Sequence, residues 1–544
     1  MRNTFKQHFQ LWLALGLIIV LAIFTRLYQL GQVPSGLTWD EAALGYVGRM
    51  VITTGRDEYG DLLPTTFVSF GDYKSPLAFY FTGSSTAIFG LSAWAVRLPF
   101  ALAGVGSVLL IMWFTWRLWR QPWLALLAGF GLITLPWHFV LSRVGFEAGT
   151  ALFFFLCLLT GWLEMHQLKA NDSVKKWIFA GLLIIIGTTA SLYTYHSAKI
   201  VIPLTWFWLI VHEFIHHRTW LNRQLKKIVV IVLSIGVLSL PALIDILTGP
   251  GLKRADSTTV FGQQDWLSTI SLIGSNLAKH LSLDWLLLGP EPILRHGTAQ
   301  FGVLLFGHLI LFWLGLTFIL GRSIQRFNRP SRLTRWQKKI QTFFKLSSTS
   351  EPTTFRPWFW LILLFVTLLP AAIGLDVPHA NRALLAVVPV IMLMILGARE
   401  LQRELSHTSF SLSIGLIVLL MIMQFSVFWN YYFTDYQAES SAVWLDGQAT
   451  AVRLAHTYQQ DGQRIKFTDY YGQPLTFYAF YNDLPIQTYR EFRVPNLDFG
   501  PVKVEDFNKY DVVISSPAEI FPGRPARIIY RQDKEPAFLI YEME

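Results

Sequence analysis

Long runs of apolar residues dominate this chain of 544 residues, and they constrain its fold more than any other feature. Hydrophobic residues make up 53% of the sequence and aromatic residues 15%, and the mean hydropathy is +0.40. Because a membrane-spanning helix needs about 20 mostly apolar residues, the runs predict an all-α polytopic membrane protein with about eleven transmembrane helices. The predicted spans lie near residues 11–28, 95–115, 122–140, 148–165, 177–194, 198–215, 228–247, 301–320, 358–375, 383–398 and 411–430.

Basic residues fall in short clusters between alternate spans, as the positive-inside rule expects of cytoplasmic loops. These clusters are Arg117 and Arg120; Lys169, Lys175 and Lys176; Arg218, Arg223, Lys226 and Lys227; the run from Arg322 to Lys345; and Arg399 and Arg403. With a cytoplasmic amino terminus, the long loops 29–94 and 248–300 and the tail after Tyr431 lie on the outer face. Membrane orientation therefore accounts for the net charge of +10, and no nucleic-acid partner is expected.

Two local features refine this prediction. Residues 11–24 have the apolar character of a signal-peptide core, but no small-residue cleavage site follows, so the segment is interpreted as an uncleaved first span. The single cysteine, Cys157, lies within an apolar run and excludes an internal disulfide or a cysteine-based metal site. The redox compartment is left undetermined.

The first outer loop carries signals for two short helices on the membrane surface. Thr38 and Glu41 have the spacing of a capping box, and the helical pattern that follows runs to Thr54 before Gly55. A second helix is expected from Pro76 to Phe89, ended by Gly90.

The tail has a different pattern from the rest of the chain. A helix is expected over 442–459, and strands over 464–469, 510–516, 526–531 and 537–542. The sequence therefore predicts two domains, a transmembrane domain of residues 1–430 and a small extracytoplasmic α/β domain of residues 431–544.

The segment from Arg26 to Gly104 contains RLYQLGQVPSGLTWDEAALGY, DYKSPLAFY and AVRLPFALAG. It resembles the bacterial members of the dolichyl-phosphate-mannose protein mannosyltransferase group, glycosyltransferase family 39, which are related to the lipid A aminoarabinose transferases. The later pieces SRVGFEAGT, SLYTYHSAK, GPEPILRHG and PHANRALLAVVP agree with the resemblance. It covers residues 20 to about 400, strongly at the start and loosely beyond Thr150, and leaves the tail unmatched.

The resemblance implies the GT-C fold and an inverting membrane glycosyltransferase. Such an enzyme takes a sugar from a polyprenyl-phosphate donor and passes it to an acceptor on the outer face. The sugar could be mannose, aminoarabinose or another hexose, and the acceptor a protein, a lipid or a cell-wall polysaccharide. Nothing in the sequence chooses among them.

Asp40 is the expected general base. A carboxylate with an ordinary pKa near ~4 is already in the form that accepts a proton at neutral pH, and the resemblance assigns this role to the first acid of the Asp-Glu pair. Glu41 is included in the catalytic pair, although successive helical side chains point in different directions and Glu41 could serve only as a cap. The alternative is that Thr38, Asp40 and Glu41 merely favour a helix amino terminus.

Lys74 is the expected partner of the donor phosphate, because a fixed cation stabilises the charge that develops on the leaving group. Relatives usually have a lysine before two prolines, whereas Ser75 replaces the first proline here. Arg295 and Arg382 are further candidates for the same phosphate. For all three, an ordinary interfacial anchor is the alternative.

Glu147, Tyr195 and His196 are the expected substrate-binding residues. Family members often have a second acid at the position of Glu147, which could position the acceptor or bind a divalent ion; a local pair with Arg143 is the alternative. Tyr195 and His196 lie in a short outer turn with Tyr193 and Lys199, where an interfacial aromatic belt also explains the tyrosines.

No metal site is predicted. His212, His216 and His217 have a spacing that invites a zinc interpretation, but they lie beside a basic cytoplasmic loop, away from the expected site. No cofactor is established by the sequence, and a divalent cation is left open.

Two other functions were weighed. A transporter or flippase of a lipid-linked sugar would also be polytopic, but such proteins usually show repeat-related halves, and the acids here cluster in an outer loop instead. A scaffold that displays the tail would leave the first loop unexplained.

Overall fold

The structure, a computed structural model, describes residues 2–169, 172–248, 259–261, 265–289, 291–327, 354–519, 521 and 523–543. The chain divides into two compact units that are each described separately. The helical unit comprises residues 1–26, 102–142 and 148–428. The loop–tail unit comprises residues 27–101, 143–147 and 429–544.

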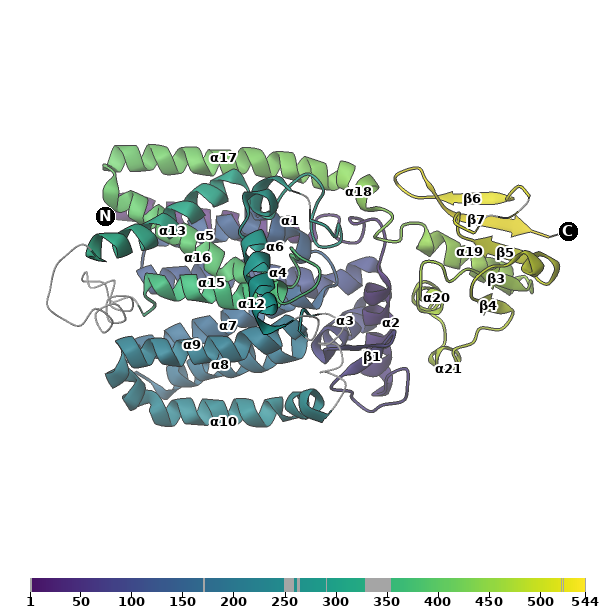
Figure 1. The fold of residues 1–544 in the computed structure, drawn as a ribbon, viewed down its shortest axis with the longest axis horizontal. Coiled ribbons are helices and arrows are strands. Elements are labelled where there is room, and N and C mark those ends of the chain that lie inside the picture. The colour runs from purple at the N-terminus through teal and green to yellow at the C-terminus, as the bar shows by residue number, and fades with distance from the viewer. Residues whose placement is uncertain are drawn as a thin grey trace. The chain divides into compact units, whose positions relative to one another are not determined.

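The helical unit is built from long helices that lie side by side (Figure 1). They are α1 (Arg2–Leu27), α4 (Ala93–Trp119), α5 (Pro122–Thr134), α6 (Pro136–Leu141), α7 (Glu147–Gln167), α8 (Val174–Thr194), α9 (His196–His216), α10 (Arg218–Thr248), α12 (Trp266–His280), α13 (Phe306–Phe327), α15 (Pro357–Ala372), α16 (Val387–Glu404) and α17 (His407–Phe433). A π-helical turn, η1 (Asp284–Leu288), follows α12, and a 3-10 turn, η2 (Leu384–Ala386), precedes α16.

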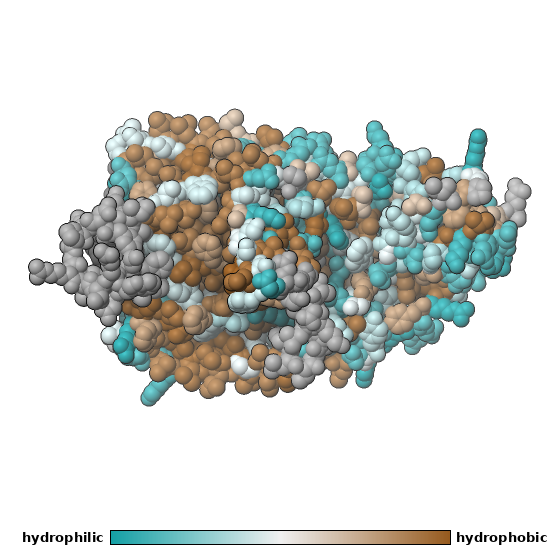
Figure 2. All heavy atoms as spheres, in the orientation of Figure 1, coloured by the Kyte–Doolittle hydropathy of each residue, from teal (hydrophilic) through white to brown (hydrophobic). Residues whose placement is uncertain are grey.

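Among the described residues, eight helices are long and apolar enough to cross a membrane, and Pro122–Thr134, Phe306–Leu320 and Pro357–Ala372 are shorter apolar helices. Their positions match the predicted spans. Figure 2 shows hydrophobic residues gathered on the face of these helices, and α10 exposes Val229, Leu233 and Val237. Such apolar exposure on a helix is typical of a surface that faces lipid. The all-α polytopic fold is therefore confirmed, whereas the cytoplasmic amino terminus stays a prediction; most of the basic run from Arg322 to Lys345 lies outside the described residues.

The first loop forms the helices expected from their end signals. Helix α2 (Trp39–Thr54) begins with a capping box between Thr38 and Glu41 and ends at Gly55, which has φ 72°. Helix α3 (Pro76–Phe89) ends at Gly90 and follows a hairpin of β1 (Phe67–Ser69) and β2 (Asp72–Lys74), which the sequence analysis missed.

Helices α2 and α3 cross closely because Gly48 and Gly83 meet. A Cβ added at Gly83 would lie 2.2 Å from the carbonyl oxygen of Gly48. This crossing holds α2 beside the hairpin that carries Lys74.

The tail forms a five-stranded sheet with the order β4-β3-β5-β7-β6. The strands are β3 (Ile465–Phe467), β4 (Leu497–Phe499), β5 (Val512–Ser515), β6 (Arg527–Tyr530) and β7 (Pro536–Glu542). Strands β4, β3 and β5 are parallel, whereas β7 is antiparallel to β5 and β6. The helices around the sheet are α18 (Asp435–Ser440), α19 (Gln448–Gln460), α20 (Pro474–Asn482) and α21 (Ile486–Arg490), with a 3-10 turn, η3 (Val504–Asn508).

The small C-terminal α/β domain is therefore confirmed, with two corrections. The predicted helix over 442–459 begins only at Gln448, because Leu445 and Gly447 have positive φ values of 54° and 92° and close a turn before it. Strand β4 and helices α20 and α21 were missed, since three-residue strands and one-to-two-turn helices give little periodic signal.

The loop and the tail share one hydrophobic core within the loop–tail unit. Tyr46 and Val47 of α2 belong to the same buried cluster as Phe480 of α20 and Phe538 of β7. A Cβ added at Gly45 would lie 2.5 Å from the Phe480 ring, so α2 and α20 are in direct contact. The division into domains of residues 1–430 and 431–544 stays a prediction. In the structure, the tail contributes to the same hydrophobic core as the first loop.

Candidate functional site

Asp40 and Lys74 form an ion pair in the loop–tail unit. Asp40 lies in the first turn of α2 with its side chain 28% exposed, and Lys74 ends β2 with its side chain 11% exposed. The Lys74 ammonium also lies 5.9 Å from the ring centroid of Phe70. The structure therefore brings together the expected base and the expected phosphate ligand at a partly open position.

Glu41, the neighbour of Asp40, is enclosed completely. Its side chain has no exposed surface, and its two carboxylate oxygens accept hydrogen bonds from Nε and Nη2 of Arg97 at 2.9 and 3.1 Å. The backbone N–H of Gly145 donates to the same carboxylate at 2.8 Å. Such a bidentate, buried pair fixes geometry rather than offering a reactive oxygen.

Arg97 connects Glu41 to the segment that precedes α2. Its guanidinium donates to the carbonyl oxygens of Pro34 at 2.9 Å and Gly36 at 2.6 Å, and it lies 5.5 Å from the ring centroid of Trp444 in the tail. A Cβ added at Gly36 would lie 1.9 Å from the carbonyl oxygen of Trp444, so only glycine fits there. Through these contacts, Arg97 holds the start of α2 and thereby the direction of Asp40.

The short segment 143–147 also belongs to the loop–tail unit. Arg143 is buried, donates to the carbonyl oxygen of Tyr28 at 2.8 Å and lies over the rings of Tyr432 and Phe433. Glu147, at the first position of α7, is half-buried. Its expected role with substrate stays a prediction.

In the helical unit, Tyr195 and Arg382 lie near each other. Tyr195 precedes the first turn of α9, where His196 is the first residue, and its hydroxyl accepts a hydrogen bond from Nδ2 of Asn381 at 3.3 Å. Arg382 follows Asn381 directly and lies 3.7 Å from a carboxylate oxygen of Asp376. Its Nη1 is buried and has no hydrogen-bond partner among the described residues.

Arg295 approaches the same region through His296. The rings of His296 and His379 stack with centroids 4.6 Å apart. Burial lowers the pKa of His296 well below its usual value, and the charges of Arg295 and Arg382 lower it further. The charges of both arginines therefore affect the His296 ring, and the region around this ring is basic.

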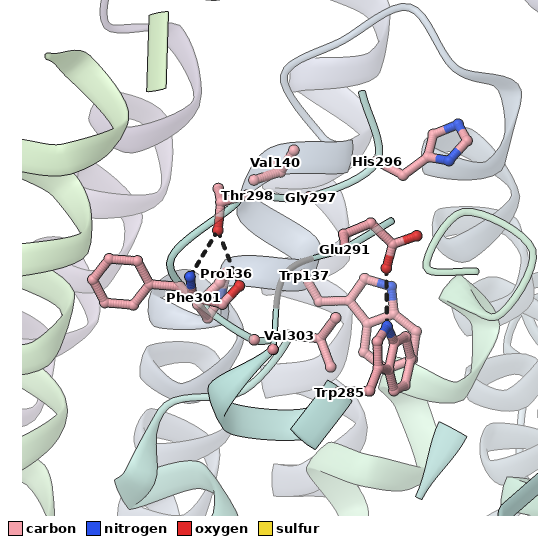
Figure 3. Close-up of a pocket in the computed structure, with 12 residues that line it drawn as sticks. Pro136, Trp137, Val140, Trp285, Glu291, His296, Gly297, Thr298, Phe301 and Val303 are labelled. Carbon is pink, nitrogen blue, oxygen red and sulfur yellow. Dashed lines mark hydrogen bonds between the residues drawn. The ribbon is translucent and has the colours of Figure 1, made fainter. Parts of the chain in front are cut away.

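A small pocket lies beside this basic region (Figure 3). It is lined by Trp137, Trp285, Glu291, His296 and Phe301, among others. Glu291 accepts hydrogen bonds from Nε1 of Trp285 at 2.9 Å and from the backbone N–H of Ala380 at 3.1 Å. These donors are neutral, and burial raises the pKa of Glu291 to about 7.

Glu291, His296 and His379 are close enough to be considered as metal ligands, since their donor atoms lie within 4.8 Å of one another. Two observations argue against a metal ion bound by these three residues. Both carboxylate oxygens of Glu291 already accept hydrogen bonds, and Nδ1 of His379 accepts one from the backbone N–H of Arg382 at 3.2 Å. A metal-binding histidine usually donates from its second nitrogen instead.

Sequence reasoning missed the residues that organise the two regions, above all Arg97, Arg143 and Glu291. A signal was present, because charged residues within or beside apolar runs are costly and usually have a defined partner. Arg97 and Arg143 stand in two of the quoted motifs and are fully buried. The sequence could not identify their partners, which come from distant segments.

Comparisons with known proteins agree with the fold and the motifs. A sequence model of the family described as dolichyl-phosphate-mannose-protein mannosyltransferase matches residues 16–249. A putative mannosyltransferase, YkcB, of Bacillus subtilis (strain 168) is 26% identical over 183 residues, which cover 33% of this chain and 24% of that protein. An undecaprenyl phosphate-alpha-4-amino-4-deoxy-L-arabinose arabinosyl transferase of Erwinia tasmaniensis is 22% identical over 349 residues, covering 63% of this chain and 57% of that protein.

The chain thus spans about a quarter of the length of the Bacillus subtilis protein. It spans somewhat over half of the length of the Erwinia tasmaniensis protein. Among solved structures, ArnT from Cupriavidus metallidurans bound to undecaprenyl phosphate superimposes with a TM-score of 0.54 at 13% identity, covering 97% of both chains. Its apo form gives a TM-score of 0.53. This similarity establishes a shared fold over nearly the whole chain.

The fold and the apolar helices define the class of the protein. It is a multi-pass membrane protein with the GT-C fold. Within that class, the chain is similar over residues 16–249 to the dolichyl-phosphate-mannose-protein mannosyltransferases, and over 349 residues to an aminoarabinose transferase. The resemblance derived from the motifs is therefore confirmed.

Proposed function

We propose that the protein is an inverting membrane glycosyltransferase that moves a sugar from a polyprenyl-phosphate donor to an acceptor on the outer face of the membrane. The family match and the undecaprenyl phosphate named for the ArnT structure support this donor class. The acceptor class, whether protein, lipid or polysaccharide, is left open. In this proposal the amino terminus is cytoplasmic and the tail is extracytoplasmic.

Asp40 is the general base of the proposed reaction. It accepts the proton of the acceptor as the acceptor oxygen or nitrogen bonds to the anomeric carbon. The bond from that carbon to the phosphate oxygen breaks, and the polyprenyl phosphate leaves with the electron pair. Attack from the face opposite the leaving group inverts the anomeric centre.

Lys74 links donor binding to the activation of Asp40. In the structure its ammonium is paired with the Asp40 carboxylate. A donor phosphate competes for the same ammonium, so binding of the donor releases the base. The same cation then stabilises the negative charge on the departing phosphate.

Arg382 and Arg295 provide a second cationic region that is suited to phosphate. The buried Nη1 of Arg382 needs a hydrogen-bond acceptor, and phosphate oxygens are strong acceptors for guanidinium groups. We assign Arg382 to the donor phosphate and Tyr195 and His196 to the substrate around it. The proposal assigns no role in the reaction to a divalent cation.

The single observation that carries the proposal is the contrast between the two adjacent acids. Asp40 is partly open and paired with a lysine, whereas Glu41 is sealed against Arg97. This contrast favours Asp40 over Glu41 as the base.

The test is Asp40→Asn in the full chain, assayed for sugar release from a radiolabelled polyprenyl-phosphate sugar with membrane extracts as the acceptor source. We expect at least a hundredfold loss of turnover, the usual contribution of a general base. Asp61→Asn, an exposed acid in the same loop, is the matched control. Unchanged turnover in a folded Asp40→Asn protein would remove Asp40 from the mechanism.

The same assay separates a transferase from a flippase. In detergent micelles no membrane separates two compartments, so a flippase has no net reaction to perform. A transferase still forms glycosylated product there.

A further inference from the structure

A second histidine and carboxylate cluster lies at the ends of the helices of the helical unit, and the proposed transfer reaction makes no use of it. It consists of His166 in the last turn of α7, Glu213 in the last turn of α9, and His217 in the turn between α9 and α10. The donor atoms of these three residues lie within 4.8 Å of one another.

Glu213 is the centre of the cluster. Its side chain has no exposed surface, and its ion-pair partners among the described residues are histidines: His166 at 3.4 Å and His212 at 3.7 Å. A buried carboxylate is costly unless a positive charge compensates it. A bound cation between the histidines and Glu213 supplies such a charge.

The unsatisfied atoms converge on one point. Nε2 of His166, Oε2 of Glu213 and Nε2 of His217 are all buried. Nε2 of His166 lies 3.4 Å from Oε2 of Glu213, but neither this contact nor any other among the described residues gives these three atoms a well-aligned hydrogen bond. Buried polar atoms are rarely left in this condition, and three of them on neighbouring residues indicate a missing ligand.

The opposite atoms of the same side chains are anchored, as they are in metal sites. Nδ1 of His166 lies 3.2 Å from Oγ1 of Thr354, and Oε1 of Glu213 accepts a hydrogen bond from Nε1 of Trp162 at 3.3 Å. Such second contacts set the tautomer and direction of the ligating atoms. His212 adds to this support, since its Nε2 accepts from the backbone N–H of Arg356 at 3.3 Å while its Nδ1 faces Glu213.

We propose that His166, Glu213 and His217 bind one divalent transition-metal ion, with zinc as the best match. Two imidazoles and one carboxylate form a recognised zinc ligand set, and bonds of about 2 Å bring one ion within reach of all three. The ion neutralises Glu213 and ties the end of α7 to the turn that joins α9 and α10.

This site is remote from His196, which the proposed function assigns to the substrate. His196 is in the first turn of α9 and Glu213 in its last, so roughly 25 Å of helix, at 1.5 Å per residue, separates them. The metal therefore stabilises the helix ends rather than taking part in sugar transfer. The sequence analysis set a metal aside because His212, His216 and His217 lie beside a basic loop; the proposed site uses only His217 of those three, with His166 and Glu213 from elsewhere in the chain.

The test uses the purified full-length protein in detergent, stripped with EDTA and titrated with Zn²⁺ against a chromogenic chelator. We expect one Zn²⁺ per chain, and Co²⁺ at the same site should give the visible absorption bands of a low-coordinate centre. His217→Gln and His166→Gln should each weaken binding by at least about tenfold, the loss that outer-shell partners alone can cause. His216→Gln, a neighbouring half-buried histidine outside the ligand set, is the matched control and should bind as the wild type does.

If the variants fail to fold, the wild type alone decides the question. Stoichiometric Zn²⁺ should raise its melting temperature, because an ion that binds only the folded state stabilises it by mass action. Absence of stoichiometric Zn²⁺ binding to the wild type, or equal losses in His217→Gln and His216→Gln, would overturn the proposal.

Discussion

Two adjacent carboxylates at the start of α2 have opposite environments. Successive side chains of a helix project about 100° apart, so Asp40 and Glu41 cannot face the same surroundings. Asp40 reaches Lys74 on the hairpin, and Glu41 reaches Arg97 in α4. One of the two adjacent acids is therefore partly exposed and the other is fully buried.

Removing the cation opposite Asp40 tests the proposed role of Lys74. We expect Lys74→Met to lower kcat by about 10²- to 10³-fold, the typical cost of losing a group that stabilises transition-state charge. Lys74→Arg, which keeps the charge, should recover part of this loss. Steady-state kinetics with varied donor measure both, and a rise in KM with unchanged kcat would instead make Lys74 a simple binding contact.

Glu41→Gln should affect folding more than chemistry. It leaves the buried Arg97 without its counter-charge, which costs about 3–5 kcal/mol for a broken buried pair. Thermal unfolding in detergent should show a large drop in melting temperature relative to Asp61→Asn. A well-folded Glu41→Gln protein without activity would show that Glu41 takes part in catalysis, as its inclusion in the acidic pair predicted.

At the scale of single residues, the sequence was informative where a motif is local. Asp40 and Lys74 were selected from two separate motifs, and the structure places them in contact. The partner of Glu41 could not be predicted, because Arg97 is 56 residues away in the sequence and no local pattern connects the two.

At the scale of elements, helix α2 was predictable because its ends are encoded within four residues. The capping box of Thr38 and Glu41 and the left-handed Gly55 depend only on local chemistry. By contrast, β4 was missed, although β3, which is equally short, falls within the predicted strand 464–469; β4 pairs in parallel with β3, and β3 pairs in parallel with β5. Their register depends on chain segments that a local pattern cannot bring together.

The loop after α2 contains an element with a predicted pH response. Glu58 is buried and accepts a hydrogen bond from the Tyr489 hydroxyl at 3.1 Å, and burial raises its pKa from the usual 4.5 to about 7. The folded state therefore holds this proton more tightly than the unfolded state does. The contribution of this group to the free energy of unfolding is fully present below pH 4.5, is lost as the pH rises to about 7, and does not change further above that pH. The total loss is about 3 kcal/mol.

Glu58→Gln keeps a hydrogen-bond partner for Tyr489 but removes the charge. We expect the variant to lose this part of the pH dependence and to melt at a higher temperature than the wild type at pH 8. Melting temperatures at pH 5 and pH 8 provide the measurement. If the melting temperatures of the variant and the wild type changed by the same amount between pH 5 and pH 8, Glu58 would have its ordinary pKa in the folded state.

At the scale of the whole molecule, the loop–tail unit is assembled from distant parts of the chain. Its core combines α2 and α3 with the sheet and helices of the tail. Arg490 of the tail donates to the carbonyl oxygen of Asp57 at 2.9 Å, which adds polar contacts at the edge of that core. The sequence predicted both partners as separate elements but gave no indication that they bury each other.

Deleting the tail after Phe433 should therefore damage the first loop as well. Removal would expose Tyr46, Val47 and their neighbours, an apolar patch that soluble surfaces rarely tolerate. We expect the truncated chain to be poorly expressed or aggregated on size-exclusion chromatography. Asp483→Ala, which removes only the exposed pair with Arg49, is the control and should cost at most about 1 kcal/mol.

A monodisperse truncated protein with unchanged transfer activity would show that the tail is an independent appendage. A folded but inactive one would show that the tail acts on the site itself.

The shared core also sets an order of events during biosynthesis. Residues 27–101 leave the ribosome long before residues 429–544, which they need for completion. At roughly 5–20 residues per second, this delay lasts about 15–65 s. During that interval the nascent first loop exposes an incomplete apolar surface outside the membrane, where a chaperone or the lipid surface has to shield it until the last segment of the chain arrives.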